Sequence, residues 1–204
     1  VVSDREFRNI ADDIKAVSQK EFAVLDEGVK EKMISEITAA KADGDSVGGV
    51  LETAVVGLPA GIGEPWFGGV ENVLSSVLFA VPAVKGVEFG AGFALTNMRG
   101  SAANDEFFCS DSKITTATNN NGGINGGITN GMPVIFRCAV KPTPTIHKEQ
   151  NTVDFIKNEN VKIAAGGRHD PCIVHRARVV IDSITAIALC DMLAGRFGTD
   201  WLGE

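Results

Sequence analysis

The sequence predicts a mixed α+β fold in which amphipathic helices are combined with short strands. Three stretches carry apolar residues at helical spacing, at residues 26–43, 70–81 and 171–194. Residues 47–57 are rich in β-branched residues and partly alternate, which predicts a strand, and a further strand is expected at 134–140. The helices and strands do not alternate strictly along the chain, which is compatible with antiparallel sheets.

Length and composition are those of an ordinary globular protein. The chain has 204 residues, 44% of them apolar and 22% charged, enough for one large or two small domains. The longest apolar stretch, 179–194, is interrupted by Asp182 and Asp191, so we expect no membrane span and a soluble protein. The chain starts at Val1 without a leader, and we expect a processed or cloned piece of a cytoplasmic protein.

The first expected helix is residues 26–43, followed by Gly44 as a stop signal. Its apolar positions recur at helical spacing and form one face, made of Val29, Met33, Ile37 and Ala40. We expect this face to pack on a sheet.

The middle of the chain continues with a strand at 47–57 and the loop LPAGIGEP. A second core helix at 70–81 follows and ends at Pro82, which cannot continue it.

Shorter segments come next. We expect extended stretches at 84–89 and 92–98, then the glycine- and asparagine-rich run NNNGGINGGITNG at 119–131. After the strand at 134–140, residues 141–152 show neither helical nor strand period and are expected to form a loop.

The last helix carries the clearest signals. Asp170 is expected to be its N-cap, Pro171 its first residue and Gly195 the residue just past its end. Such a helix would be about 36 Å long. Its buried stripe would consist of Ile173, Ala177, Ile181, Ile184 and Ala188.

The stretch GGRHDPCIVHRA, at 166–177, has two interpretations. Asp170 and Pro171 are what a helix start requires even without a ligand. The free N–H groups of such a start, beside Arg168 and two glycines, would also suit a phosphate.

Cysteines and histidines do not indicate a metal site. Cys109, Cys138, Cys172 and Cys190 are widely spaced, and the three histidines do not fall at zinc-finger spacing. We expect these cysteines to act as small apolar core residues in a reducing cytoplasm.

The net charge of −7 is unevenly distributed. From Pro133 to Arg178 there are eight Lys or Arg against four Asp or Glu, so this strip is +4 and the remainder is −11. A basic strip on an acidic protein suits a small anion better than nucleic acid, although a solvated charged loop is the simpler explanation.

Two further segments could bind phosphate. GGINGG, at 122–127, lacks both the Lys-Ser/Thr ending of a P-loop and the G-x-G-x-x-G spacing. KPTPT, at 141–145, combines a lysine, hydroxyl donors and rigid prolines, but an ordinary turn has the same composition. The sequence has no G-x-S-x-G elbow, so hydrolase chemistry has little support.

Taken together, seven segments resemble the chorismate synthase family, in that family's order. They are GDSVGG at 44–49, GLPAGIGEPWF at 57–67, PAVKGVEFGAGF at 82–93, RGSAANDEF at 99–107, NNNGGINGGITNG at 119–131, AVKPTPTI at 139–146 and GGRHDPC at 166–172. The resemblance implies a β-α-β sandwich of antiparallel sheets around core helices, usually assembled as a homotetramer.

The resemblance also implies an activity. In the shikimate pathway for aromatic amino acids, 5-enolpyruvylshikimate 3-phosphate loses phosphate and a ring proton in a 1,4-elimination that gives chorismate. This lyase reaction requires reduced FMN without net oxidation, and NADP is associated with the family. A flavin and a phosphorylated substrate would account for the +4 strip. The alternative is a non-enzymatic anion- or nucleotide-binding domain.

The family's site residues carry over where motifs match. Asp170 corresponds to an aspartate implicated in proton handling and is the expected catalytic residue. Arg168 corresponds to an arginine that serves the flavin and phosphate region. The remaining flavin positions are Pro82, Ala83, Gly126, Lys141, Pro142, Thr143, Pro144 and Thr145.

One departure is large, because the family's Gly-Glu-Ser-His-Gly segment, arginine-rich loops and two proposed acid histidines have no counterpart here. We therefore expect residues 1–204 to be the C-terminal half of a chorismate synthase-like domain, inactive alone. It would comprise a strand and helix region at 1–45 and flavin and substrate segments at 46–204.

Overall fold

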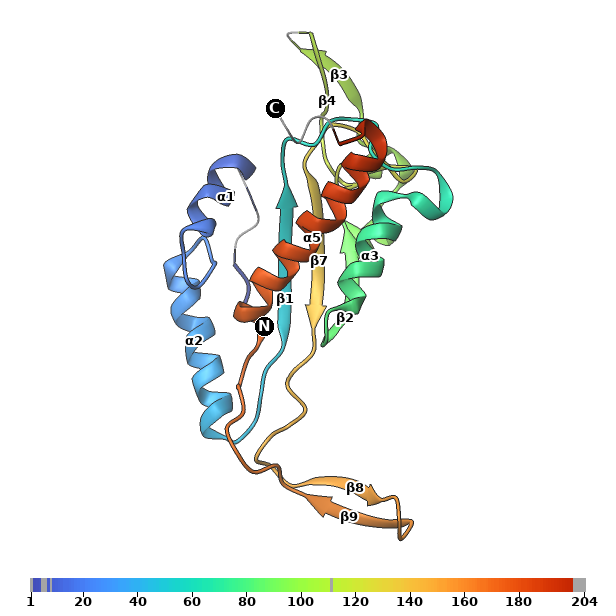
Figure 1. Cartoon of the computed structure of the whole chain (residues 1–204). Coiled ribbons are helices and arrows are strands. Elements are labelled where there is room, and N and C mark those ends of the chain that lie inside the picture. The colour runs from blue at the N-terminus through green and yellow to red at the C-terminus, as the bar shows by residue number, and fades with distance from the viewer. Residues whose placement is uncertain (1, 5–6, 8, 111, 200–204) are drawn as a thin grey trace.

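A three-stranded antiparallel sheet forms the centre of the protein in a computed structural model that describes residues 2–4, 7, 9–110 and 112–199. Its strands are β1 (Gly49–Val55), β7 (Val134–Val140) and β2 (Val84–Phe89), in the order β1-β7-β2 (Figure 1). The predicted strands at 47–57, 84–89 and 134–140 are confirmed, the first two residues shorter at each end.

The central strand β7 shows why this sheet forms. Val134, Phe136 and Cys138 alternate with more exposed residues and are fully buried. Leu51 of β1 and Val87 of β2 both lie opposite Cys138, so the three strands present their apolar residues on the same face. Burial raises the pKa of the Cys138 thiol to about 11, so it stays a neutral core group.

Two helices, α3 (Val70–Ala80) and α5 (Val174–Phe197), cover this apolar face (Figure 1). In α3 the buried residues Val70, Leu74 and Leu78 recur every four positions and lie on one stripe. Ile181 and Leu189 of α5 join the same core. The predicted helices at 70–81 and 171–194 are therefore core helices.

The bounds of α5 differ from the prediction at both ends. The N-cap is Ile173, with no side-chain cap bond, so Asp170 is not a cap and Pro171 is not in the first turn. Residues before the helix run along the start of the sheet, where the Pro171 carbonyl accepts a hydrogen bond from Val47 N (2.8 Å). At the other end Gly195 lies within the helix, and Gly198, with φ +76°, follows its last residue.

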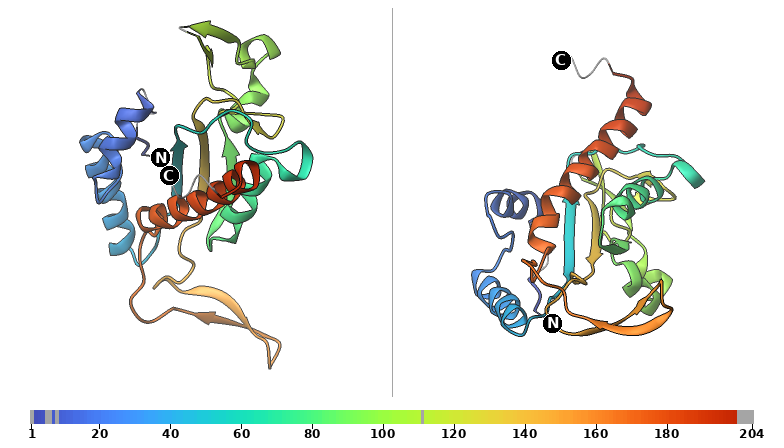
Figure 2. Two further views of the ribbon diagram at one scale, coloured as in Figure 1. Left: turned by 45° about the horizontal axis from the view of Figure 1, so that its top comes forward. Right: turned by 60° about the horizontal axis from the view of Figure 1, so that its bottom comes forward.

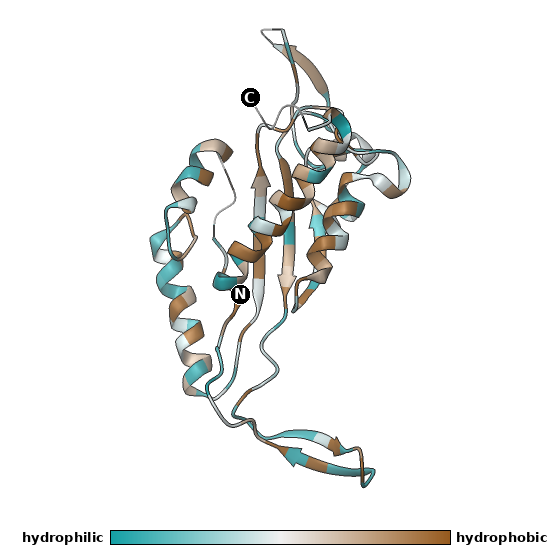
Figure 3. Ribbon diagram, in the orientation of Figure 1, coloured by the Kyte–Doolittle hydropathy of each residue, from teal (hydrophilic) through white to brown (hydrophobic). Residues whose placement is uncertain are grey.

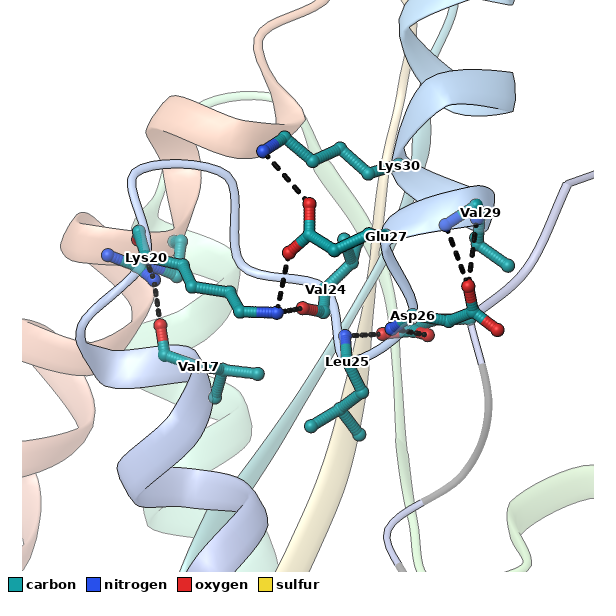
Figure 4. A network of polar contacts seen from close by, with 11 residues as sticks. Val17, Lys20, Val24, Leu25, Asp26, Glu27, Val29 and Lys30 are labelled. Atoms are coloured by element: carbon teal, nitrogen blue, oxygen red, sulfur yellow. Dashed lines mark hydrogen bonds and ion pairs between the residues drawn. The ribbon is translucent and has the colours of Figure 1, made fainter.

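The N-terminal region contains helices α1 (Ile10–Ser18) and α2 (Glu27–Ala42). Its expected span, 1–45, includes residues 1, 5, 6 and 8, which lie outside the described part, and the described part contains no strand. Asp26 caps α2 by accepting from Gly28 N and Val29 N, and Lys20 reaches Glu27 (2.8 Å; Figure 4).

The predicted packing of residues 26–43 on a sheet is wrong. Helix α2 has no buried residue, and its apolar positions are only half-buried. Helices α3 and α5 already occupy the apolar face of the sheet, and α2, in which hydrophilic and hydrophobic residues are mixed, lies beside that layer (Figure 3). Arg178 of α5 instead donates to the carbonyls of Val17 and Lys20 and so attaches α1.

Several smaller elements were not predicted. Residues 92–98, expected to be extended, form the 3-10 helix η2 (Gly92–Asn97), which begins at Gly92 with φ +52°. Strand β8 (Gln150–Asp154) overlaps the predicted loop 141–152 and pairs with β9 (Glu159–Ile163). The others are η1 (Trp66–Gly68), α4 (Gly100–Ala103), β3 (Phe107–Ser110), β4 (Lys113–Thr116), β5 (Ile124–Asn125) and β6 (Ile128–Thr129).

No helix in the described part of the chain combines the length and apolarity that a membrane span needs. Two of the four cysteines, Cys138 and Cys172, are buried as expected, whereas Cys109 and Cys190 are exposed.

Candidate functional site

The antiparallel register brings distant segments to one end of the sheet, which we call the site end. Gly49 of β1 and Val84 of β2 both lie opposite Val140, the last residue of β7. The start of β1, the start of β2 and the end of β7 therefore meet, at the lower end of the sheet in Figure 1. Ala83 precedes β2 and Lys141 follows β7, so these predicted site residues are neighbours.

Ala83 has an unusual backbone at this position. Its φ of +74° lies in the left-handed region, which residues with a Cβ rarely adopt. The Ala83 carbonyl accepts a hydrogen bond from Lys141 N (2.9 Å), which helps to hold this conformation. Strained residues of this kind persist where the surrounding structure determines them and are common at functional sites.

The KPTPT segment packs closely on the chain before β1. Ser46 Oγ donates to the Thr143 carbonyl (2.7 Å), and a Cβ on Gly48 would lie 2.9 Å from Pro142 N. Gln150 donates to the Pro144 carbonyl (3.1 Å). The Thr143 hydroxyl is buried and has no hydrogen-bond partner among the described residues. A buried polar atom without a partner is unusual in a folded protein.

The GGRHDP segment lies beside KPTPT. Ala165 N donates to the Ile146 carbonyl (3.2 Å), and His147 Nδ1 lies 3.1 Å from the Ala165 carbonyl. The rings of His147 and His169 are tilted against each other with centroids 5.4 Å apart. The structure therefore brings Arg168 and Asp170 to the same end as Lys141 and Thr143.

The basic strip does not form a single positive patch. Five of its eight cations are engaged with acidic groups or with carbonyls in ways that serve the fold: Arg137–Glu88, Lys148–Asp43 and Asp45, Lys162–Glu149, Arg176–Asp170, and Arg178 with Val17 and Lys20. Hydrogen bonds to Asp43 and Asp45 raise the pKa of Lys148 above its usual range.

Three cations of the strip remain without a side-chain partner among the described residues: Lys141, Lys157 and Arg168. Lys157 lies in the turn between β8 and β9, away from the sheet. Lys141 and Arg168 are both exposed at the site end. The free positive charge is thus concentrated in two of the residues expected to bind the flavin and phosphate.

Asp170 is held by an ion pair with Arg176, in the first turn of α5. Both side chains are substantially exposed, so the pair contributes little to folding. Only one carboxylate oxygen pairs with Arg176, and the other makes no hydrogen bond or ion pair with a described residue. Sequence reasoning missed this partner because it assigned the carboxylate to a helix cap.

Gly126 lies at the opposite end of the sheet from the other predicted flavin residues. It stands in the β5–β6 turn, beside the N-terminus of α3, where Val70 N donates to the Gly127 carbonyl (2.9 Å). Strand β7 separates the two ends by roughly 20 Å, at about 3.4 Å per residue. No described atom lies within 4 Å of a Cβ built on Gly126, so its surroundings are open.

The other glycines of this run serve the fold. A Cβ on Gly123 would lie 2.5 Å from the Pro133 carbonyl oxygen, and one on Gly122 would lie 2.5 Å from Gly90 N. Both have positive φ. Asn119 donates to the Pro133 carbonyl and accepts from Gly123 N. The run therefore packs as a tight loop and leaves only its β5–β6 turn open.

Asp105 organises this loop and was not predicted. It is 3% exposed, and its carboxylate accepts hydrogen bonds from Thr118 Oγ1, Asn120 N, Asn121 N and Asn121 Nδ2 (2.7–2.9 Å). Desolvation raises the pKa of Asp105, but these hydrogen bonds outweigh it and the net pKa lies below the usual value. The signal available in the sequence was an aspartate upstream of an asparagine-rich run, whose side-chain amides can donate to a carboxylate.

The surface at the site end is hollowed only slightly. A shallow depression of ≈ 200 Å³ is lined by Pro144, Thr145, Gln150, Ile163 and Ala165. A second, of ≈ 310 Å³, lies along α3 and is lined by Glu71, Asn72, Ser75, Ser76 and Phe79. In the described part of the chain no cluster of His, Cys, Asp or Glu could hold a metal ion.

Comparison with known proteins places these features in context. Residues 4–194 match the sequence profile described as "Chorismate synthase". A chorismate synthase of Thermococcus kodakarensis is 48% identical over 171 residues, covering 84% of this chain and 48% of that protein. One of Methanobrevibacter smithii is 52% identical over 155 residues, covering 76% and 43%.

The fold agrees with these sequence matches. A solved structure described as "Crystal Structure of Chorismate Synthase" superposes with a TM-score of 0.73 at 30% identity, over 90% of this chain and 48% of that one. The predicted α+β class is confirmed. The chain spans about half the length of the relatives it matches.

Proposed function

The chain belongs to the chorismate synthase family, and from that premise we propose that it supplies one half of a chorismate synthase site. The reaction would convert 5-enolpyruvylshikimate 3-phosphate to chorismate and phosphate in the shikimate pathway. The observation that carries this proposal is the convergence of unpaired Lys141 and Arg168 with the unpartnered Thr143 hydroxyl at the site end.

The residues at the site end fit reduced FMN. A flavin phosphate needs cations and hydroxyl or N–H donors, which Lys141, Arg168 and Thr143 would provide. The chemistry that reduced FMN would supply when bound is a transient donation of electron density, which would let the carbon–oxygen bond to the phosphate break. The open β5–β6 turn at Gly126 would allow a ring to approach the backbone, but it lies roughly 20 Å from Lys141 and would not belong to the flavin site of the same copy.

Each segment would have a separate task. Pro82 and Ala83 would present the strained turn beside Lys141, and the prolines of KPTPT would keep Thr143 and Thr145 in fixed directions. Arg168 would hold a phosphate through its planar fork of donors. Pro142 packs closely against Gly48, and the Pro144 carbonyl accepts a hydrogen bond from Gln150 of β8, so the KPTPT segment would keep its shape.

Asp170 would receive the ring proton through the carboxylate oxygen that does not contact Arg176. Arg176 would orient the carboxylate and compensate its charge. The task of the protein would be to fix this base and the phosphate relative to each other, since orientation contributes much of such catalysis.

The wider properties that go with this proposal are those of a cytoplasmic enzyme that acts on a small phosphorylated substrate. We propose a homo-oligomer, a homotetramer in the complete protein, with neither nucleic acid nor membrane as a partner. NADP would be relevant only to the supply of reduced flavin.

The test uses the 204-residue chain under anaerobic conditions with reduced FMN and 5-enolpyruvylshikimate 3-phosphate, following chorismate absorbance. We expect weak flavin binding and no turnover by the chain alone, and turnover when the complementary half of a relative is added. Robust turnover by the chain alone would contradict the split of the site. Flavin binding that never leads to turnover would favour an anion- or nucleotide-binding domain.

A further inference from the structure

Helices α1 and α2 and the loop between them, residues 9–43, lie outside the core, and we call them the helix pair. Both views of Figure 2 show them on one flank of the molecule, beside the start of α5. Within residues 9–43, all of which the structure describes, only Asp13 and Val24 are buried. None of these residues belongs to the apolar core that α3 and α5 form with the sheet. The core therefore contributes little to holding the helix pair in place.

Polar contacts within the helix pair join its two helices. Lys20 Nζ donates to the Val24 carbonyl and pairs with Glu27, both at 2.8 Å (Figure 4). Glu27 also pairs with Lys30 (3.1 Å), one turn further along α2. Lys20 follows the end of α1 and Glu27 is the first residue of α2. These contacts connect the end of one helix to the start of the other, so the two helices should move as one body.

Two residues of α5 fasten the loop of the helix pair, and we call them the latch. Arg178 Nη1 donates to the carbonyls of Val17 (3.1 Å) and Lys20 (3.2 Å). The Val17 carbonyl lies at the C-terminal end of α1, where the helix dipole favours a cation. The ring of His175 stacks on Phe22, with centroids 6.0 Å apart and 18° between the planes. The helix pair is thus held by a cation and a ring from one helix.

The latch is weaker than the core that surrounds α5. The Nε atom of Arg178 is buried and has no partner among the described residues, so the guanidinium is partly shielded from water. Hydrogen bonds in such surroundings are weakened less by solvent. Opening of the core would nevertheless expose fully buried side chains such as Leu74 and Phe136, whereas the helix pair buries few apolar groups. Regions of this kind open locally, below the free energy of global unfolding.

The other end of the helix pair is pinned where the chain enters β1. The Gly44 carbonyl accepts a hydrogen bond from His147 N (2.9 Å), and Lys148 pairs with Asp43 and Asp45. Gly44 has a φ of +67°, a conformation that glycine adopts without strain. This pinned turn is a point about which α2 could swing while β1 keeps its pairing with β7.

We propose that the helix pair opens as one cooperative unit about the turn at 43–45 while the sheet, α3 and α5 stay folded, and that Arg178, supported by His175, keeps it closed. The latch lies in the first two turns of α5, directly after the segment that carries Arg168 and Asp170. Opening would therefore release the start of α5 from its contacts with the helix pair without breaking the core.

Hydrogen exchange of the 204-residue chain, followed by mass spectrometry, tests the proposal. We expect the amides of α1 and α2 to exchange together, at least about tenfold faster than those of β7 and α3. Arg178→Gln should accelerate exchange in the helix pair by about tenfold, the equivalent of one hydrogen bond to a charged group, and leave β7 and α3 unchanged. Arg178→Lys should keep part of the protection, because an ammonium can still donate to a carbonyl.

Two further variants separate the latch from general effects. Arg176→Gln is the matched control, because Arg176 lies on the same helix and pairs with Asp170 instead of the helix pair. It should leave exchange in α1 and α2 as in wild type. Phe22→Ala removes the ring stack from the side of the helix pair, and it should accelerate exchange there while α5 keeps its own sequence.

Several outcomes would overturn the proposal. If α1 and α2 were protected as strongly as β7, or exchanged at unrelated rates, they would not open as a separate unit. If Arg178→Gln left the helix pair unchanged, or accelerated β7 equally, Arg178 would not be its latch. An equal effect of Arg176→Gln would assign the change to lost charge on α5. None of these measurements involves flavin or substrate, so they are independent of the proposed activity.

Discussion

The buried carboxylate of Asp105 accepts hydrogen bonds from both the backbone N–H and the side-chain amide of Asn121, at 2.8 and 2.9 Å. Together with Thr118 and Asn120, these contacts hold the asparagine-rich start of the glycine loop. The loop in turn packs against Gly90 and Pro133 at one end of the sheet. Asp105 therefore has a structural role that can be tested apart from catalysis.

Asp105→Asn should destabilise the chain by roughly 2–4 kcal/mol, because an amide removes the charge and points a donor at other donors. The measurement is thermal or urea unfolding at neutral pH. Asp191→Asn, on the exposed side of α5, is the control and should change stability by less than about 0.5 kcal/mol. Equal stability of Asp105→Asn and wild type would refute this role.

The lowered pKa of Asp105 also predicts a pH dependence. Because the folded-state value lies below that of the unfolded chain, the contribution of Asp105 to stability is fully present above the unfolded value, about 4. It is lost as pH falls through the folded value. The difference in unfolding free energy between wild type and Asp105→Asn should therefore shrink on acidification. A difference that grew in acid would contradict the assignment.

Asp170→Asn should leave stability within about 1 kcal/mol of wild type, because it breaks only an exposed ion pair with Arg176 and no helix cap. In a complete enzyme it should abolish turnover, since asparagine cannot accept the ring proton. Unfolding and steady-state kinetics measure the two effects separately. Arg176→Gln should reduce turnover less, because it removes the partner and keeps the base. Wild-type turnover by Asp170→Asn would remove this residue from the chemistry.

Arg168→Ala should weaken binding of FMN or phosphate about 10- to 150-fold, the equivalent of one charge-assisted hydrogen bond. Arg168→Lys should recover only part of the affinity, because a point charge lacks the fork. Calorimetry measures the affinity of both variants. Lys157→Ala serves as control because it removes one positive charge from the turn between β8 and β9, away from the sheet. If Lys157→Ala lost as much affinity as Arg168→Ala, the effect would reflect net charge alone.

Two glycines of one loop should be destabilised by alanine to very different degrees. Gly123→Ala should prevent stable folding, because its Cβ would overlap the Pro133 carbonyl and φ is +79°. Gly126→Ala, in open surroundings with φ +60°, should cost about 1–2 kcal/mol of stability and leave flavin binding unchanged, because this turn lies roughly 20 Å from the site end. Unfolding and flavin titration measure the two properties. Weaker flavin binding by Gly126→Ala would show that this turn contacts the cofactor after all.

Local patterns predicted the central elements well. Strand β7 is a mostly apolar run that alternates in burial and is bounded as expected, and α3 follows its four-residue apolar repeat to the turn before Pro82. The family resemblance rested on whole segments whose order is preserved, and the comparisons confirmed it. These features succeed because each is encoded within a few neighbouring residues.

Features that depend on distant partners were not predictable in this way. The Asp170-Pro171 pair has the composition of a helix start. However, the Pro171 carbonyl accepts a hydrogen bond from Val47 N and the Asp170 carboxylate pairs with Arg176, and the helix begins later. The face of α2 was periodic, but nothing in its sequence showed that α3 and α5 would already cover the sheet.

By itself, the sequence determined the α+β class, the positions of the core strands and helices, the family, and the candidate residues from Pro82 to Asp170. Only the tertiary structure decided which of the basic residues in the strip remain without an acidic partner, because Lys148, Lys162 and Arg137 form ion pairs with carboxylates. It also decided that Gly126 lies at the far end of the sheet from Lys141. Ion pairs and strand register join residues that are far apart in the chain, and local sequence patterns carry no information about such distances.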